Sequence, residues 1–164
     1  MRAVVVDRLM EPSELRVSEA PLPKLWPGTL AVDVRAAGCN FFDILMCQGK
    51  YQMKPPFPFI PGAEASGVVV EVAGDVKGFA TGDRVLFSTP LGAFAERAVA
   101  SARGAWKMPA KMSFEEAAAF PIVYPTSYAA LVYRARLQPG EWREMTAGEI
   151  ASVFPGLKIT RDRT

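Results

Sequence analysis

At 164 residues the chain is long enough for one domain with a hydrophobic core and short for two. Half of its residues are hydrophobic and 22% are charged, which is the balance of an ordinary soluble globular protein. A net charge of +2, with Lys and Arg scattered along the chain, excludes a basic nucleic-acid-binding face, and two cysteines exclude a disulfide framework.

The N-terminal third predicts short strands and one helix. Residues 2–6 and 15–17 are expected to pair antiparallel around a turn at 11–13. Residues 30–36 alternate apolar and polar side chains, which predicts a half-buried strand. Residues 40–48 then change to a helical period, with Asn40 as the N-cap, Asp43 in the first turn and Gly49 as the stop.

The middle of the chain is rich in valine and glycine. Residues 66–72 include three consecutive valines and predict a strand buried on both faces. Pro61 and Gly62 turn the chain into this strand, and three further glycines lead to a second short strand at 83–87. Gly-rich corners between short strands favour a small, strongly bent barrel.

The last part of the chain predicts one more strand, at 92–100, and then helices. Ser113 and Glu116 have the capping-box spacing, so a helix begins there, and Pro121 is expected to end it. A second helix is predicted at 125–136, with an apolar face of Tyr128, Leu131 and Val132. Thr146 and Glu149 repeat the capping-box spacing and predict a short helix in the tail.

Residues 61–85 read PGAEASGVVVEVAGDVKGFATGDRV. This segment resembles the GroES-like catalytic domain of the medium-chain dehydrogenase/reductase superfamily, in which Gly-x-Glu precedes a core strand and a Gly-Asp-x-Val turn follows. Residues 1–141 are similar to zinc-independent quinone oxidoreductases, the ζ-crystallin-like branch, and the similarity stops after Glu141. The resemblance implies a mainly β fold with peripheral α-helices, a GroES-like partly open β-barrel over 1–141, and an unrelated tail over 142–164.

The residues available to bind a metal are few. The chain has no histidine and two cysteines, Cys39 and Cys47, whereas a catalytic zinc needs three protein ligands and a structural one usually four. Zinc-dependent relatives carry a Cys-His pair where Asn40 and Phe41 stand here, and a histidine where Ala63 stands. We therefore interpret both cysteines as small core thiols and expect no metal.

Without a metal, negative charge that develops on a carbonyl oxygen must be met by hydrogen-bond donors. Asn40 offers an amide donor where zinc-dependent relatives place a ligand, and it can cap the helix at the same time. Tyr51 corresponds to a family tyrosine beside the substrate cleft, although an exposed loop tyrosine is the alternative. These two residues are the candidate catalytic residues.

The resemblance also suggests residues for the cofactor. Thr126 matches a threonine that contacts the nicotinamide carboxamide in relatives, so Asn40 and Thr126 are the candidate cofactor-binding residues. The alternative role of Thr126 is to cap the helix that follows it. Glu64 matches the family carboxylate and is expected to anchor the start of its strand by hydrogen bonds.

The dinucleotide-binding unit of the family has no counterpart in this sequence. Nicotinamide dinucleotides bind through a βαβ unit with a glycine-rich turn, and neither G-x-G-x-x-G nor the family variant A-x-G-G-V-G occurs. We therefore expect the substrate-side half of an NADPH-dependent, zinc-free quinone or enone oxidoreductase, truncated or alternatively spliced and without its Rossmann domain. NADPH is the cofactor of the full-length family; we expect this chain to bind none tightly, which leaves its status as an enzyme open.

Other functions stay open at this point. The chain can instead be a non-catalytic binding or regulatory module that pairs with a full-length reductase subunit or with a second copy. A chaperonin-10-like assembly module is suggested by the fold alone, and enoyl reduction inside a larger synthase is a variant of the enzyme hypothesis. An aromatic group, Phe41, Phe42, Tyr51 and Phe57, indicates a small apolar carbonyl or quinone as substrate.

The expected location is cytoplasmic. The N-terminus lacks a charged segment followed by an apolar run, and the most apolar window, 117–133, is interrupted by prolines. We therefore expect neither membrane nor nucleic acid as a partner.

Overall fold

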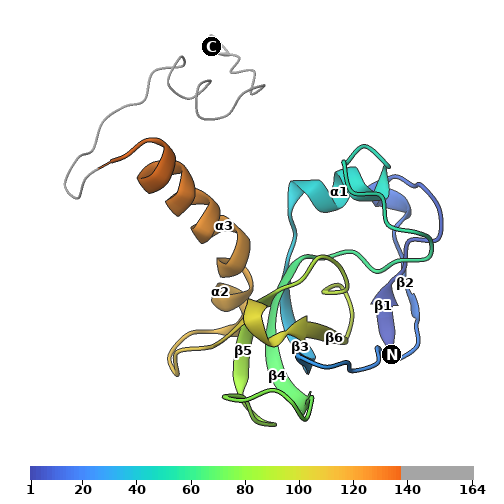
Figure 1. The fold of residues 1–164 in the computed structure, drawn as a ribbon. Coiled ribbons are helices and arrows are strands. Elements are labelled where there is room, and N and C mark those ends of the chain that lie inside the picture. Colours follow the sequence, from blue (N-terminus) through green and yellow to red (C-terminus); the bar gives the residue numbers. More distant parts are fainter. Residues whose placement is uncertain (138–164) are drawn as a thin grey trace. The chain divides into compact units, whose positions relative to one another are not determined.

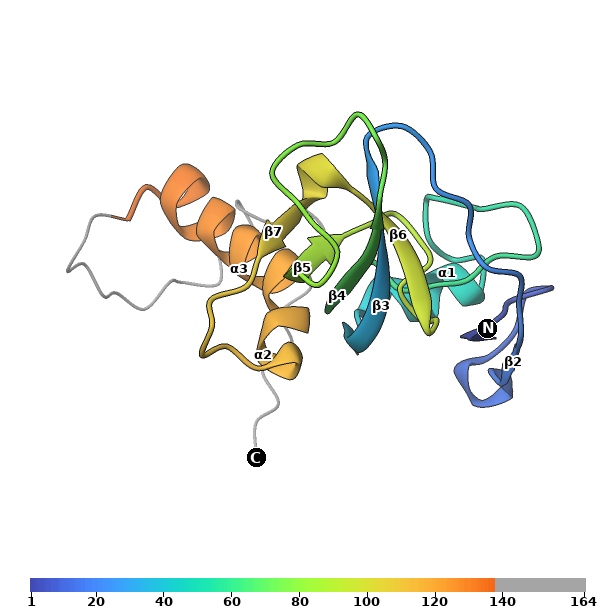
Figure 2. The same ribbon diagram turned by 90° about the horizontal axis from the view of Figure 1, so that it is seen from below.

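The computed structural model describes residues 1–137 and divides into two compact units, Met1–Ile122 and a second that begins at Val123. The first unit contains a two-stranded and a five-stranded antiparallel sheet, the latter in the order β6-β3-β4-β5-β7 (Figures 1 and 2). The strands are β1 (Arg2–Val4), β2 (Val17–Glu19), β3 (Thr29–Gly38), β4 (Glu64–Val72), β5 (Arg84–Ser88), β6 (Arg97–Ser101) and β7 (Ala105–Lys107).

The helices are few and short. They are η1 (Pro12–Glu14), α1 (Phe41–Cys47), η2 (Ala102–Gly104), α2 (Phe114–Ala118), α3 (Phe120–Tyr128) and a π-helical segment, η3 (Ala129–Arg134). Within the described part of the chain, the five-stranded sheet is open, because its end strands β6 and β7 each pair along one edge only. The other sheet consists of β1 and β2 and is open as well. The expected mainly β, GroES-like fold with peripheral helices is confirmed.

The β3–β4 pair is irregular, which bends the sheet. Its register shifts between Ala31 and Val32 and again between Val34 and Ala36. Such bulges increase the local twist of a strand pair. At Gly67, β4 lies so close to β3 that a Cβ atom would collide with the backbone carbonyl of Asp33, so only glycine fits there without a backbone shift.

The prediction that residues 30–36 form a half-buried strand is wrong for its first half. Leu30, Ala31 and Val32 are all buried, although the alternation places Ala31 on the polar face. β3 lies in the middle of the bent sheet, between β4 and β6. A short alternation of small and polar residues does not distinguish such an enclosed strand from one that faces water.

Two apolar clusters hold the sheet and α1. The sheet cluster includes the fully buried Leu30, Val32 and Phe87. A second cluster lies beneath α1 and contains Val6, Met10, Met46, Cys47 and Phe59. Because Met46 and Cys47 come from the last turn of α1, burial of this cluster fixes the helix whose N-terminus carries Asn40.

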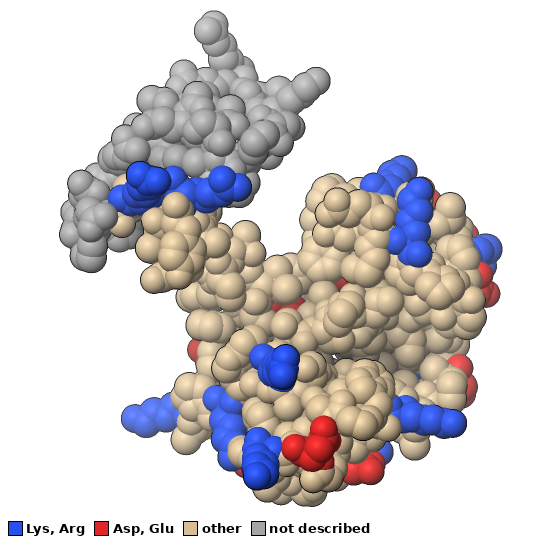
Figure 3. All heavy atoms as spheres, in the orientation of Figure 1, with Lys and Arg blue, Asp and Glu red and all other residues tan. Residues whose placement is uncertain are grey.

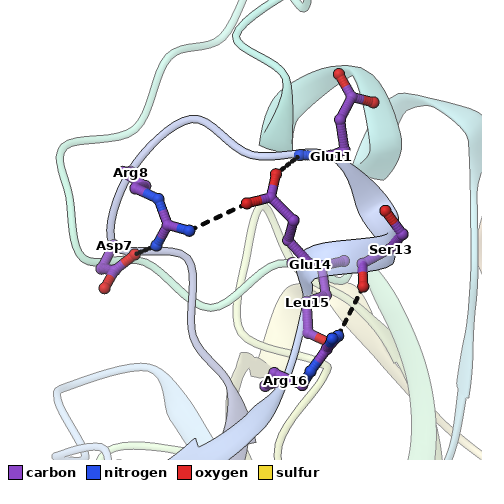
Figure 4. A network of polar contacts seen from close by, with 7 residues as sticks. All are labelled: Asp7, Arg8, Glu11, Ser13, Glu14, Leu15 and Arg16. Atoms are coloured by element: carbon purple, nitrogen blue, oxygen red, sulfur yellow. Dashed lines mark hydrogen bonds and ion pairs between the residues drawn. The ribbon is translucent and has the colours of Figure 1, made fainter.

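The turn between β1 and β2 is stabilised by its own polar contacts (Figure 4). Glu14 accepts a hydrogen bond from the backbone N–H of Glu11 at 2.8 Å and forms an ion pair with Arg8 at 3.1 Å. These contacts hold the pKa of the Glu14 carboxyl below its usual value, the backbone hydrogen bond being the larger cause. The predicted antiparallel pairing around this turn is confirmed. The second strand lies two residues later than the predicted 15–17, because the turn η1 extends to Glu14.

The predicted helix boundaries near Pro121 are wrong. α2 ends at Ala118, and Pro121 lies in the first turn of α3, where its missing N–H costs no hydrogen bond. Pro125 lies inside α3 rather than at the start of a helix. The capping box at Ser113 is confirmed, whereas the helix predicted from Thr146 lies outside the described residues.

Two further features differ from the sequence predictions. β7 was not predicted, and the strand expected at 92–100 is shorter, because β6 covers Arg97–Ser101 alone.

Lys and Arg side chains on the face drawn in Figure 3 lie in small groups on the first unit, interspersed with acidic ones. No helix within residues 1–137 has the length and apolarity needed to cross a membrane.

Candidate functional site at the start of α1

Asn40 is the N-cap of α1, as predicted, and forms a capping box with Asp43. The backbone N–H of Asn40 donates to the Asp43 carboxylate at 2.9 Å, and the N–H of Asp43 donates to the Asn40 carbonyl at 3.0 Å. Asn40 is half-buried, so the site lies at the surface of the first unit and not in its core. The local sequence therefore fixes the backbone on which the Asn40 side chain stands.

Glu64 holds the Asn40 side chain by a hydrogen bond. The Asn40 Nδ2 donates to Oε1 of Glu64 at 2.9 Å, and the backbone N–H of Ile122 donates to Oε2 at 2.8 Å. Glu64 is 2% exposed and is the first residue of β4. The expectation that Glu64 anchors the start of its strand by hydrogen bonds is therefore confirmed, and its two partners are new.

Asp43 is a second buried carboxylate at the site. Beyond its bond to Asn40, its other oxygen accepts the N–H of Gly62 at 3.2 Å. Burial raises the pKa of the Asp43 carboxyl, two backbone hydrogen bonds oppose this, and the nearby Glu64 charge raises the pKa further. From the sequence, Asp43 was predicted only to lie in the first helical turn. The Asn-x-x-Asp spacing is the sequence signal that indicates its capping role.

Tyr51 packs beside α1 and is not the exposed loop residue of the alternative interpretation. Its ring stacks on Phe42, with centroids 5.5 Å apart, and both rings pack against the cluster beneath α1. The structure gives its phenol no hydrogen bond to another described residue. Asn40 and Tyr51 thus belong to the same unit and flank the same helix.

Thr126 lies in the second unit and is exposed. α3 begins six residues earlier, at Phe120, so the alternative role of Thr126 as a helix N-cap is wrong. Its suggested role in cofactor binding stays a prediction.

The aromatic pocket expected from Phe41, Phe42, Tyr51 and Phe57 is not a single enclosure. Phe41 is 74% exposed, and Phe57 stacks on Phe59 rather than on Tyr51. An apolar hollow of about 520 Å³ lies elsewhere, with Leu22, Phe59, Ile60 and Leu91 in its lining. These four residues carried no signal in the sequence beyond their apolarity.

The described residues do not assemble a metal site. Within residues 1–137, no three side chains among Cys, His, Asp and Glu are grouped so that they could hold an ion. Cys47 is buried, and burial raises the pKa of its thiol. Cys39 is exposed, which corrects the interpretation of both cysteines as core thiols: it precedes the helix and lies outside the cluster that encloses Cys47.

The described residues also offer no βαβ unit for a dinucleotide. Every strand pair within 1–137 is antiparallel, whereas a βαβ unit joins parallel strands.

Comparisons with known proteins agree with this architecture. The family model of the alcohol dehydrogenase GroES-like domain matches residues 26–110. Quinone oxidoreductase-like protein 2 of Rattus norvegicus is 40% identical over 146 residues, which cover 89% of this chain and 41% of the relative. The crystal structure of the human synaptic vesicle membrane protein VAT-1 homolog-like protein gives a TM-score of 0.81 at 38% identity, covering 84% of this chain and 44% of that one.

A third comparison concerns a protein solved with a cofactor. The quinone oxidoreductase of Thermus thermophilus, whose structures include a complex with NADPH, gives a TM-score of 0.72 at 38% identity. The match covers 86% of this chain and 43% of that one. The fold and these matches define the class of domain: it is a GroES-like domain of the alcohol dehydrogenase type.

The chain belongs to the medium-chain dehydrogenase/reductase superfamily, among its quinone oxidoreductase-like and VAT-1-like members. This confirms the resemblance drawn from residues 61–85. The chain spans about two fifths of the length of the curated relatives it matches, 41% in the rat protein.

Proposed function

We propose that this domain provides the substrate side of a zinc-free, NADPH-dependent quinone or enone reductase. The observation that carries the proposal is the Asn40 side-chain amide, held by a hydrogen bond of 2.9 Å to buried Glu64 at the start of α1. A fixed amide of this kind is a preorganised donor for an oxygen on which negative charge develops. The quinone oxidoreductase relatives support the class of substrate.

The roles of the three candidate residues differ. Asn40 donates to the substrate oxygen, and the Tyr51 phenol provides a second donor beside α1. Thr126 contacts the nicotinamide carboxamide, a role that rests on resemblance alone. NADPH bound by a complete reductase supplies the hydride, and the residues here bind and orient the acceptor.

Quinone affinity tests this proposal in the chain itself. We expect 9,10-phenanthrenequinone to bind in a calorimetric titration, and Asn40→Ser to weaken binding about five- to tenfold, the loss of roughly one hydrogen bond. Serine retains an N-cap oxygen, so the helix start is preserved. This quinone has no free ring position for addition of the exposed Cys39 thiol, unlike 1,4-benzoquinone.

The matched control for that titration is Gln52→Ala. Gln52 is exposed and lies next to Tyr51, so its loss should leave the affinity unchanged. Equal affinity in wild type and Asn40→Ser would remove Asn40 from the site, and no saturable binding in wild type would refute the proposed function.

A second candidate function, a module that pairs with another reductase subunit or a second copy, is favoured by one observation. Along α3 and η3, Val123, Tyr128, Leu131 and Tyr133 are 45% to 71% exposed. Apolar side chains gathered on one helical segment are typical of a surface that binds a partner. This candidate predicts that the mass in sedimentation rises with protein concentration.

The variant pair Tyr128→Ser and Leu131→Ser tests this second candidate. We expect it to abolish the increase in mass, whereas Ser127→Ala on the same helix should not. A mass equal to one chain at every concentration would argue against pairing with a second copy.

A further inference from the structure

Two buried carboxylates hold Asn40, one through its backbone and one through its side chain. Asp43 accepts the backbone N–H at 2.9 Å, and Glu64 accepts the side-chain Nδ2 at 2.9 Å. Asp43 is 4% exposed and Glu64 2%, so water competes poorly for either bond. Asn40 is therefore restrained at its backbone and at the end of its side chain.

These contacts decide which way the Asn40 amide faces. A carboxylate accepts hydrogen bonds only, so Glu64 selects the nitrogen of the Asn40 amide and repels its oxygen. The backbone carbonyl of Asn40 accepts the N–H of Asp43 at 3.0 Å, which fixes the backbone from which the side chain extends. Nδ2 carries two N–H groups, of which Glu64 accepts one, and Asn40 as a whole residue is half-buried.

We propose that Glu64 is a positioning residue, which orients Asn40 so that the second Nδ2–H is the donor presented to the oxygen of a quinone or carbonyl ligand. This inference rests on the proposed function for the identity of the ligand. The orientation itself is a property of the ligand-free chain and can be measured without a quinone.

Gly38 makes the arrangement sensitive to a single methyl group. Gly38 pairs with Glu64 across β3 and β4, and a Cβ atom on Gly38 would collide with the Oε1 that receives the Asn40 bond. Gly38→Ala thus displaces the carboxylate without changing its charge. Glu64→Met removes both acceptor oxygens and keeps a side chain of similar length.

Asn40 is the sole asparagine of the chain. Protein grown on ¹⁵N-asparagine therefore shows one side-chain amide nitrogen in NMR spectra, correlated with its two Nδ2 protons. In the wild type we expect the two Nδ2 protons to differ, with the proton bound to Glu64 shifted downfield and slow to exchange. In Glu64→Met and in Gly38→Ala we expect its exchange to become at least about tenfold faster, the factor for one hydrogen bond of about 1.4 kcal/mol. The matched control is Glu71→Met, at an exposed position of the same strand.

Binding of 9,10-phenanthrenequinone adds a readout that a purely structural role would not move. If Glu64 acts through Asn40, Glu64→Met and Asn40→Ser each weaken binding, and the double variant weakens it no further than the stronger single change. Additive losses would overturn the positioning role.

The wild-type spectrum tests the orientation of the Asn40 amide by Glu64 even where a variant fails to fold. Two Nδ2 protons that both exchange at the rate of a free amide would overturn the proposal, as would unchanged exchange in a folded Gly38→Ala. A protected Nδ2 proton in a chain that binds no quinone would instead refute the proposed function and leave the orientation of Asn40 by Glu64 in place.

Discussion

Asp43 is the residue whose protonation should change stability most clearly with pH. Its folded pKa is raised, first by burial, above the ordinary value of 3.8. Between the ordinary pKa of 3.8 and the raised pKa of the folded state, the folded chain binds more protons than the unfolded chain. The free energy of unfolding therefore falls as pH rises through this interval. We expect the difference in free energy of unfolding between wild type and Asp43→Asn, measured with urea, to shrink as pH rises above the ordinary value of 3.8.

Asp43→Asn should also lower the free energy of unfolding at pH 7, by about 1–3 kcal/mol, because one amide oxygen replaces two carboxylate oxygens that receive two N–H groups. The control is Asp7→Asn, since Asp7 is exposed and paired with Arg8 at the surface. A difference that grows as pH rises would contradict the raised pKa of Asp43.

At the scale of the elements, close approach of β4 to β3 is the feature most sensitive to substitution. Gly67→Ala places a methyl group against the Asp33 carbonyl and should lower the free energy of unfolding by about 1–3 kcal/mol. Gly74→Ala is the matched control, because nothing lies within 4 Å of a Cβ atom there. Equal urea midpoints for the two variants would show that the sheet is less tightly paired than described.

The elements that sequence reasoning predicted well are those fixed by neighbouring residues. α1 follows from Asn40, Asp43 and Gly49, all within one helix and its ends, and Gly49 does adopt a positive φ of 68°. The short β7 follows no such local signal, because its pairing with β5 depends on residues far along the chain.

The same distinction applies to the site. Asn40 was identified by its place at the start of a helix in a resembling family, which is a local pattern. The bond of its side chain to Glu64 joins residues 24 positions apart, and that of Glu64 to Ile122 spans 58. The Asn40–Glu64 bond lies next to the Gly38–Glu64 pair in the register of β3 on β4, which no periodicity in one strand determines. The bond to Ile122 depends instead on where α3 packs, which no local pattern determines either.

At the scale of the whole molecule, the 164-residue chain should not consume NADPH with 9,10-phenanthrenequinone. Most of the affinity for a dinucleotide comes from its pyrophosphate and adenosine, which a glycine-rich βαβ turn binds. A loss of about 5 kcal/mol weakens binding several-thousand-fold. Absorbance at 340 nm measures NADPH consumption. Saturable turnover that is lost in Thr126→Ala would contradict this expectation and show that the chain binds NADPH without a βαβ turn.

On the proposed function, the start of α1 presents the Asn40 amide to the oxygen of a quinone. The most direct measurement is a titration of the ¹⁵N-asparagine-labelled chain with 9,10-phenanthrenequinone, followed on the Asn40 side-chain signal. We predict a saturable shift of the Nδ2 proton that is not bound to Glu64, with the affinity found by calorimetry. A saturable calorimetric signal with no change at Asn40 would place the quinone elsewhere and contradict this role of Asn40.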